Sequence, residues 1–358
     1  VGLEYNNYRD KARPDLTDEW RARENYVGIY SAFRYKLDQQ VYGLNANIRY
    51  NNYKFGIADS TLAPDITGFN IGNVMVNLNP HITHRSLDEK LTARAGFNLV
   101  FDAYDKTVPT LAPDIHLQYA LFNNHLLPYV AVNGFGVRQN TFRSVSQTNH
   151  FIRSDIELRN ERNWLNVKGG IRGSIAENIS IDANFSTGRH VDKMLFILDT
   201  SIVRGNQFKP FFADITISKL EVALTYQLRE KMKFDVLGQL FSYQTSLTPY
   251  AWNLPDYVIQ FRGHYNVFDK FIVNADLSFL GGRKMREFGP GEGIEVTDNV
   301  FHSNMGLLAD VNLSVEYRYN SRVSAFIQLN NLAAQQYLRW MNYPVYGFQV
   351  MGGATFRF

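Results

Sequence analysis

Ionisable side chains recur at every second position in many segments of this chain, and apolar side chains fill the positions between them. Arg94 and Asp102, for example, share one parity, while Ala95, Phe97 and Leu99 share the other. A period of two predicts a β-strand with one polar and one apolar face. Such a polar face can select a passing solute by charge and hydrogen bonding, provided that it lines a water-filled interior.

Charged side chains on these faces need water or a partner, because a charge at the midplane of a bilayer costs roughly 2–4 kcal/mol. We therefore expect the polar faces to line a lumen. The ionisable residues predicted to line it are Arg34, Arg49, Arg94, Asp102, Lys168, Arg172, Asp182, Glu221, Asp235, Arg262, His264, Asp276, Asp310, Glu316 and Arg318. For any single residue we favour a plainer interpretation, in which opposite charges pair across neighbouring strands and each pair contributes little. The near balance of 37 basic and 34 acidic residues predicts weak ion selectivity at most.

No arrangement of residues typical of an enzyme emerges. The glycine-rich stretch 289–293 lacks the lysine and the following helix of a phosphate-binding loop, which indicates a loop tip. His81 and His84 are three residues apart in a predicted strand, so they point to opposite faces and cannot share a metal ion. His302 and Ser303 lack a third partner for nucleophilic catalysis. We expect no catalytic site, no metal and no cofactor, and thus no enzymatic activity.

The composition indicates which elements position these side chains. The chain has 358 residues, no cysteine, and a 14% aromatic share that includes 26 Phe and 21 Tyr. Phe and Tyr favour strands and membrane–water interfaces. The net charge of +3 is too small and too interspersed to indicate nucleic acid. No run approaches the roughly 20 apolar residues of a membrane helix, which leaves a closed β-barrel as the structure predicted to span a bilayer.

Short and long connections alternate between the predicted strands, as expected of short periplasmic turns and long extracellular loops. The seven short ones lie at 38–40, 86–89, 123–125, 177–178, 230–231, 269–270 and 320–321. The eight long ones lie at 9–23, 56–68, 105–113, 141–162, 190–212, 246–255, 284–303 and 333–344. The predicted fold is all-β: a single domain over residues 1–358, forming a transmembrane antiparallel up-and-down β-barrel of about 16 strands. An even number of strands places both termini on the periplasmic side.

A soluble β-sandwich or β-propeller is the rival fold. The predicted strands run to roughly 10–15 residues, longer than the usual 5–6 of soluble sheets. Their apolar face is nearly continuous, and no blade-length repeat stands out. These features favour the membrane barrel.

The longest loop, His190–Phe212, carries the apolar stretch Met194–Leu198 and leaves three interpretations open. It could narrow the lumen as a constriction or cap its mouth, extend two strands above the membrane, or dock a partner protein. The stretch Phe151–Leu158 is likewise either a strand extension or a loop hairpin.

The C-terminal segment resembles the end of a TonB-dependent receptor barrel, with the flavour of such barrels in Bacteroidota. The resemblance rests on Asn331-Leu332 after the penultimate strand, Tyr337 in the following loop, Pro344 and Gly347 before and within the last strand, and the terminal Phe358. It implies an outer-membrane location and a terminal aromatic, Phe358, that the barrel assembly machinery reads. Neither a plug domain nor an energy-coupling box is visible, and the N-terminus carries no secretory leader, which indicates a mature or trimmed chain.

Three functions follow as hypotheses. The first is an outer-membrane channel or transporter of small polar solutes, without nucleic acid as a partner. The second is the barrel of a TonB-dependent receptor whose plug lies outside this sequence. The third is a structural barrel subunit that docks a surface lipoprotein or another subunit of an outer-membrane assembly or secretion complex.

Overall fold

The computed structural model describes residues 1–10, 20–57, 69–104, 107–153, 156–200, 206–291 and 293–357, and their regular secondary structure is almost entirely β-strand. The strands of eight or more residues number sixteen: β1 (Gly2–Asp10), β2 (Trp20–Leu37), β3 (Gln40–Ile57), β4 (Phe69–Arg85), β5 (Leu91–Ala103), β6 (Thr107–Tyr119), β7 (Leu126–Asn133), β10 (Asn166–Ala176), β11 (Ile179–Leu198), β12 (Phe208–Leu228), β13 (Met232–Thr245), β14 (Tyr257–Val267), β15 (Phe271–Gly281), β19 (Leu308–Arg318), β20 (Val323–Asn330) and β23 (Gln349–Phe356). The shorter elements are β8 (Gly136–Arg138), α1 (Phe142–Thr148), β9 (Glu161–Asn163), β16 (Lys284–Arg286), β17 (Glu295–Thr297), β18 (Val300–Asn304), β21 (Leu338–Trp340) and β22 (Tyr343–Pro344).

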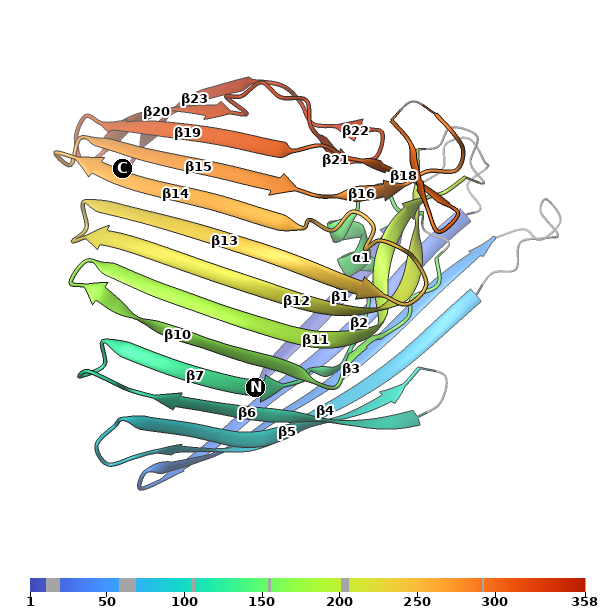
Figure 1. Ribbon diagram of the computed structural model, residues 1–358, viewed down its shortest axis with the longest axis horizontal. Coiled ribbons are helices and arrows are strands. Elements are labelled where there is room, and N and C mark those ends of the chain that lie inside the picture. Colours follow the sequence, from blue (N-terminus) through green and yellow to red (C-terminus); the bar gives the residue numbers. More distant parts are fainter. Residues whose placement is uncertain are drawn as a thin grey trace. The chain divides into compact units, whose positions relative to one another are not determined.

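The long strands pair antiparallel with their neighbours along the chain (Figure 1). β2 and β3, for example, run in register from Trp20 opposite Ile57 to Leu37 opposite Gln40. This up-and-down pattern is the predicted one, and the sixteen long strands agree with the predicted number. Closure of the sheet into a complete barrel stays a prediction. Among the described residues, no helix is long and apolar enough to cross a membrane.

The chain divides into two compact units, each considered below by itself. The first unit comprises Val1–Gln118, Val130–Val167 and Gly188–Thr216, and the second comprises Tyr119–Tyr129, Lys168–Thr187 and Ile217–Phe358.

Within the first unit the strands keep the predicted separation of faces. Directly opposite residues share a face of a sheet, so the register aligns Arg49 with Met75 and Met75 with Asp102 on the polar face. Ile48 and Tyr50, of the other parity, remain 48% and 42% exposed. Large apolar side chains that are exposed along one face of a sheet suit contact with lipid rather than with water.

All seven predicted short turns connect consecutive long strands. Several place a non-glycine residue in the left-handed region, including Asp38 (φ 50°), Asn123 (φ 53°) and Asp269 (φ 56°). Asn and Asp tolerate this conformation better than other side chains, which suits them to tight hairpin turns.

The long connections were predicted less well. The expected loop at 105–113 is wrong, because β6 already begins at Thr107 and carries Pro109 and Pro113 within it. The loop at 246–255 is confirmed, while 284–303 folds into a small sheet of β16, β18 and β17 and 333–344 contains the β21–β22 pair. The greater parts of loops 9–23 and 56–68 lie outside the described residues.

The segment His190–Phe212 extends two strands, as one of its three interpretations held. β11 continues to Leu198 and β12 begins at Phe208. Leu195 and Phe196 are 1% and 8% exposed, so this apolar stretch packs internally and offers no docking surface. Phe151–Leu158 forms neither a strand nor a hairpin among its described residues; Ile152 makes only an isolated bridge to Phe208.

Candidate functional site

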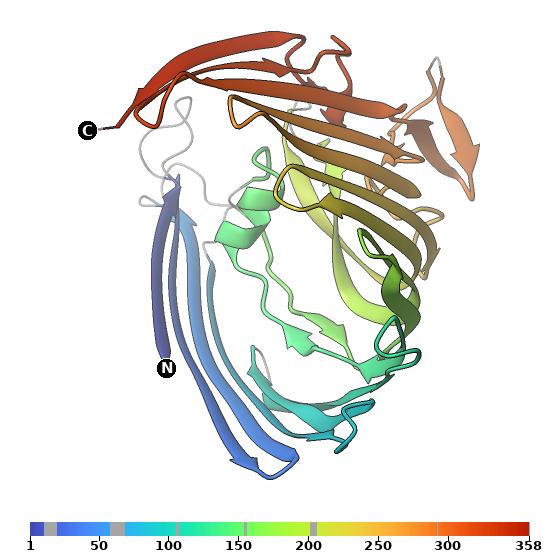
Figure 2. The same cartoon turned by 90° about the vertical axis from the view of Figure 1, so that its left-hand side faces the viewer.

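In the first unit, the chain between β7 and β10 folds onto the polar face of β2–β5. We call the described residues within the range 134–165, which are 134–153 and 156–165, the inner segment; it comprises β8, α1 and β9. Figure 2 shows α1 on one side of the curved strands that begin the chain. The sequence predicted a long loop at 141–162 and did not predict that it would fold inward.

Two glycines allow the chain to enter this face. An added Cβ at Gly134 would lie 2.4 Å from the Trp164 carbonyl oxygen, a distance that only glycine permits. Gly136 has a φ of +71°, in the left-handed region that glycine adopts without strain. Asn98 of β5 fixes the entry by donating a 2.7 Å hydrogen bond to the Gly134 carbonyl.

An apolar cluster anchors the start of the inner segment. Val137 packs with Met75 of β4 and Val100 of β5, and the three side chains are 2%, 0% and 0% exposed. Met75 and Val100 lie on the same face as Asp102. The polar face therefore also carries apolar side chains, and the inner segment covers them. Burial of such side chains contributes about 1.5–3 kcal/mol each.

The helix α1 is held by its own cap and by aromatic packing. Thr141 caps the N-terminus by accepting a hydrogen bond from the Ser144 amide, and the Ser144 hydroxyl oxygen accepts one from the Thr141 amide in return. Phe142, 2% exposed, stacks on Tyr53 of β3 with ring centroids 5.2 Å apart and contacts Tyr8 of β1 at 5.3 Å. A seven-residue helix is too short to be stable alone, so this packing must hold it in place.

Glu24 of β2 ties the sheet to the start of this helix. Its carboxylate accepts hydrogen bonds from the backbone amides of Phe142 (2.6 Å) and Arg143 (2.9 Å), and a third from Asn51 Nδ2 (3.0 Å). The side chain is only 2% exposed. A buried carboxylate needs such donors, and the first amides of a helix lack partners within the helix. The arrangement therefore satisfies both groups at once.

A cavity of about 310 Å³ lies beside this contact. Its lining is almost wholly polar: Glu4, Asn6, Glu24, Tyr26, Arg49, Gln139, Thr141, Arg143, Ser144 and Gln147. The two carboxylates and two guanidinium groups balance, and hydroxyl and amide groups supply both donors and acceptors. This lining can hold water or a small polar solute.

The end of the inner segment is fastened by charge. Glu161, 4% exposed at its side chain, has His190 Nδ1 at 2.6 Å, Lys193 Nζ at 3.2 Å and Arg138 Nη1 at 3.7 Å. Burial acts to raise the pKa of the Glu161 carboxyl, but the hydrogen bond with His190 and the charges of Lys193 and Arg138 outweigh it and hold this pKa below its ordinary value. The carboxylate is thus stabilised in its charged form.

The predicted lumen-lining residues of the first unit lie on the polar face and are mostly paired. Arg94 forms an ion pair with Asp114 at 2.6 Å, and Arg49 Nη2 lies 3.0 Å from the Met75 sulfur. Asp102 accepts from Asn160 of the inner segment at 2.9 Å. Arg34 lies near the short-turn end of β2, where it is exposed.

In the second unit several of the predicted residues form ion pairs, two of them between neighbouring strands and three between residues two apart on one strand. The ion pairs are Arg172–Asp182 (3.6 Å), Lys219–Glu221 (2.7 Å), Lys233–Asp235 (3.2 Å), Arg262–Asp276 (3.4 Å) and Arg318–Glu316 (3.2 Å). The other predicted residues have different partners: Lys168 lies over the Tyr129 ring, His264 contacts Asn274, and Asp310 accepts from Asn312. The structure brings these side chains onto one polar face; their lining of a lumen stays a prediction. Phe358 lies outside the described residues.

The sequence reading missed Glu24, Gln139, Phe142 and Glu161. The available indication was the apolar content of the predicted loop 141–162, since Phe142 and Val145 would otherwise be exposed to water. The Thr141-to-Ser144 spacing also fits a helix N-cap.

Two of the sequence predictions concern metal binding and the pair His302 and Ser303. Within the part of the chain that the structure describes, no group of three His, Cys, Asp or Glu side chains could hold a metal ion. His302 and Ser303 turn to different partners, with His302 Nε2 3.0 Å from Thr297 Oγ1 and Ser303 donating to Glu287 at 2.8 Å.

Comparison with known proteins establishes the fold. No family model matches the chain. No curated protein matches it either. Solved structures do: the copper transporter OprC (TM-score 0.66, 13% identity, 95% of this chain and 57% of that one), the pyoverdine outer membrane receptor FpvA from Pseudomonas aeruginosa (0.62, 12%, 95% and 53%) and the FrpB iron transporter from Neisseria meningitidis (0.66, 12%, 95% and 56%).

This chain spans a little over half the length of the solved structures that it matches. The match extends over 95% of the chain, far beyond the C-terminal strands that carry the sequence resemblance. The nearly all-β, up-and-down antiparallel sheet is therefore the fold of outer-membrane β-barrel receptors and transporters.

Proposed function

We propose that this chain is an outer-membrane transport barrel that passes small polar solutes along its polar inner face, narrowed in the first unit by the inner segment. The observation that carries this proposal is the docking of residues 134–165 on the polar face through Glu24. A face that met only bulk water would need no such buried, hydrogen-bonded layer. The apolar side chains of the other face then meet outer-membrane lipid.

The chemistry of the inner face supports solutes that are small and polar. The cavity beside Glu24 carries balanced charges and many hydroxyl and amide groups, and many charged side chains on the polar face of the second unit are likewise paired. Paired charges leave little net field, so hydrogen bonding and size would select the solute more than its charge would.

Solute flux into liposomes tests this function. Liposomes that contain the purified chain are placed in iso-osmolar solutions of neutral sugars of increasing size, and swelling is recorded. The proposal predicts rapid entry of the smallest sugars with a sharp size limit, and an enlarged limit when residues 139–160 are replaced by a short Gly/Ser linker. Equal exclusion of all sugars by inserted protein would overturn it.

A second candidate is the barrel portion of a TonB-dependent receptor. The likeness to metal and siderophore transporters and receptors favours it, together with the C-terminal resemblance. An upstream coding region with a plug-like domain would support this candidate. Restored solute exclusion on co-expression of that domain with this chain would establish it, and continued free entry would reject it.

A further inference from the structure

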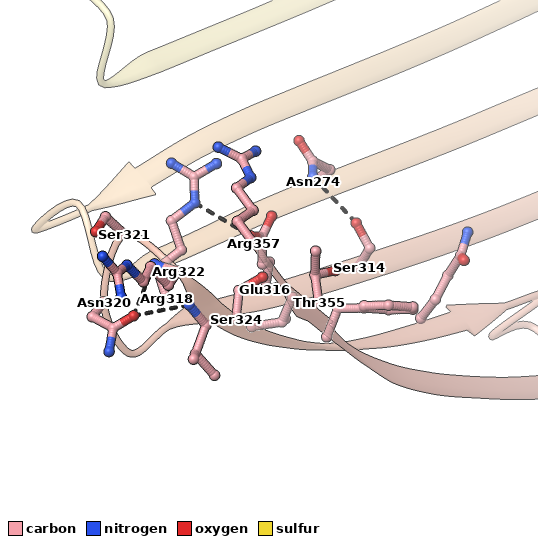
Figure 3. A pocket seen from close by; sticks show the side chains of 14 residues that line it. Asn274, Ser314, Glu316, Arg318, Asn320, Ser321, Arg322, Ser324, Thr355 and Arg357 are labelled. Carbon is pink, nitrogen blue, oxygen red and sulfur yellow. Dashed lines mark hydrogen bonds and ion pairs between the residues drawn. The ribbon is translucent and has the colours of Figure 1, made fainter.

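The second unit holds a cavity of about 590 Å³ at the short-turn ends of β19, β20 and β23, which Figure 3 shows with its lining side chains. Arg318, Arg322 and Arg357 all line it, and Glu316 is the one carboxylate among its lining residues. Hydroxyl and amide side chains supply most of the rest, among them Ser324 and Thr355. The lining therefore carries two more positive charges than negative ones.

The strand register explains how these arginines come together. Ser324 lies opposite Arg318 of β19 on one side and opposite Thr355 of β23 on the other. Continued by two residues, the same β20–β23 register puts Arg322 opposite Arg357, and the Arg357 amide donates a 2.8 Å hydrogen bond to the Arg322 carbonyl. The three guanidinium groups thus belong to one face of three adjacent strands.

Two like charges placed directly across a strand pair destabilise the sheet. Elsewhere on this unit's polar face, basic side chains pair with acidic ones, as in Arg172–Asp182 and Arg262–Asp276. Here Arg318 pairs with Glu316, whereas within the described part of the chain neither Arg322 nor Arg357 forms an ion pair. A bound anion would neutralise the excess positive charge of Arg322 and Arg357.

The turn that carries Arg322 is stabilised by hydrogen bonds to a side chain within it. The Asn320 side chain accepts hydrogen bonds from the backbone amides of Arg322 and Val323, both at 2.8 Å. Such Asx turns fix the backbone locally. Arg322 therefore projects from a defined position, and less ordering is needed when it binds a ligand.

We propose that this cavity is an oxyanion-binding site, formed by Arg318, Arg322 and Arg357 with the hydroxyls of Ser324 and Thr355, for a solute that bears phosphate or carboxylate groups. Guanidinium groups match both oxyanions with paired N–H donors. The inference rests on the charge and register of this cavity and stands whether or not the chain transports solutes.

Direct binding to the purified chain in a neutral detergent tests the site. Inorganic pyrophosphate is the phosphate probe and citrate the carboxylate probe, each titrated by calorimetry. We expect R322Q and R357Q each to raise the dissociation constant about tenfold. A hydrogen bond to a charged group changes the affinity by about that factor. R229Q removes an exposed arginine from another short turn and should bind like the unaltered chain.

Chemical protection tests the same site without mutation. Phenylglyoxal modifies accessible arginines, and peptide mapping reports each position. Bound pyrophosphate or citrate should slow modification of Arg322 and Arg357 but not of Arg229. Protection by one probe alone identifies the ligand class. The assignment would be overturned if neither pyrophosphate nor citrate bound, or if R229Q and R357Q lost affinity equally.

Discussion

The Glu24 carboxylate accepts a 2.6 Å hydrogen bond from the backbone amide of Phe142, which lies 118 residues further along the chain. This contact joins the second strand to a short helix in the connection between β7 and β10. Through this contact the connection lies against the polar face of the sheet. The transport proposal depends on that placement.

Replacing Glu24 with Gln should loosen the helix without disturbing the strands. The amide accepts fewer and weaker hydrogen bonds than the carboxylate, so docking of α1 should weaken by about 1.5–3 kcal/mol. Hydrogen exchange should then accelerate at residues 141–145. The matched change E177Q, in an exposed short turn, should leave exchange there unaltered; the same protection in E24Q would contradict the anchoring role.

Phe142→Ala should release the inner segment more completely. Its ring is buried between Tyr8 and Tyr53, and truncation of a buried Phe costs about 3–5 kcal/mol. Limited trypsin digestion of the membrane-embedded protein should cut at Arg143 or Arg153 faster than in the unaltered chain. Phe122, 74% exposed in a short turn, provides the control F122A, which should be cut at the original rate.

The Glu161 contact should respond to acid. Its pKa is lowered in the folded protein, so its contribution to stability is complete above the ordinary glutamate pKa and is lost as the pH falls through the lowered value. The melting temperature of E161Q should therefore lie below that of the unaltered chain at pH 7. The two temperatures should converge as the pH falls below the lowered pKa of Glu161, and a constant difference would contradict the role of ionised Glu161.

Lipid-facing positions should reject charge. Ala95 is exposed and Leu277 alternates with polar neighbours, so A95R and L277R should each cost roughly 2–4 kcal/mol at the membrane midplane and lower the yield of assembled protein. S278R, on the polar face next to Leu277 and opposite Asp310, should assemble normally. Heat-modifiable migration on gels measures assembly, and normal migration of A95R and L277R would refute the face assignment.

Removal of Phe358 tests the expectation that comes from the C-terminal resemblance. If the assembly machinery reads the terminal aromatic, the shortened chain should reach the outer membrane in lower yield. Phe358→Tyr keeps a terminal ring and should restore the yield. The same yield for the deletion and the unaltered chain would reject this signal.

Most of the correctly predicted fold came from the local alternation of polar and apolar residues. Period two identified strands such as β5, and the short breaks between alternating segments identified hairpin turns such as 38–40 and 269–270, because both depend on neighbours in sequence. The prediction failed at β6, where a loop was expected over 105–113 although the strand includes Pro109 and Pro113.

The site was harder to predict because it depends on contacts that are distant in sequence. Nothing near Glu24 indicates that its partner is Phe142, and nothing near Glu161 indicates His190 or Lys193. The loop singled out as a possible constriction, His190–Phe212, extends strands instead, and the inward layer comes from residues 134–165. The lining of a lumen by the charged side chains stays a prediction, and their partners on neighbouring strands, such as Asp276 for Arg262, follow from the strand register.

Ion conductance of the purified chain in a planar lipid bilayer tests the transport proposal most directly. A polar passage narrowed by the inner segment predicts stable ohmic steps with weak ion selectivity, and larger steps for E24Q than for the control E177Q. Silent bilayers, with protein shown to be inserted and rich in β-structure, would contradict an open polar passage.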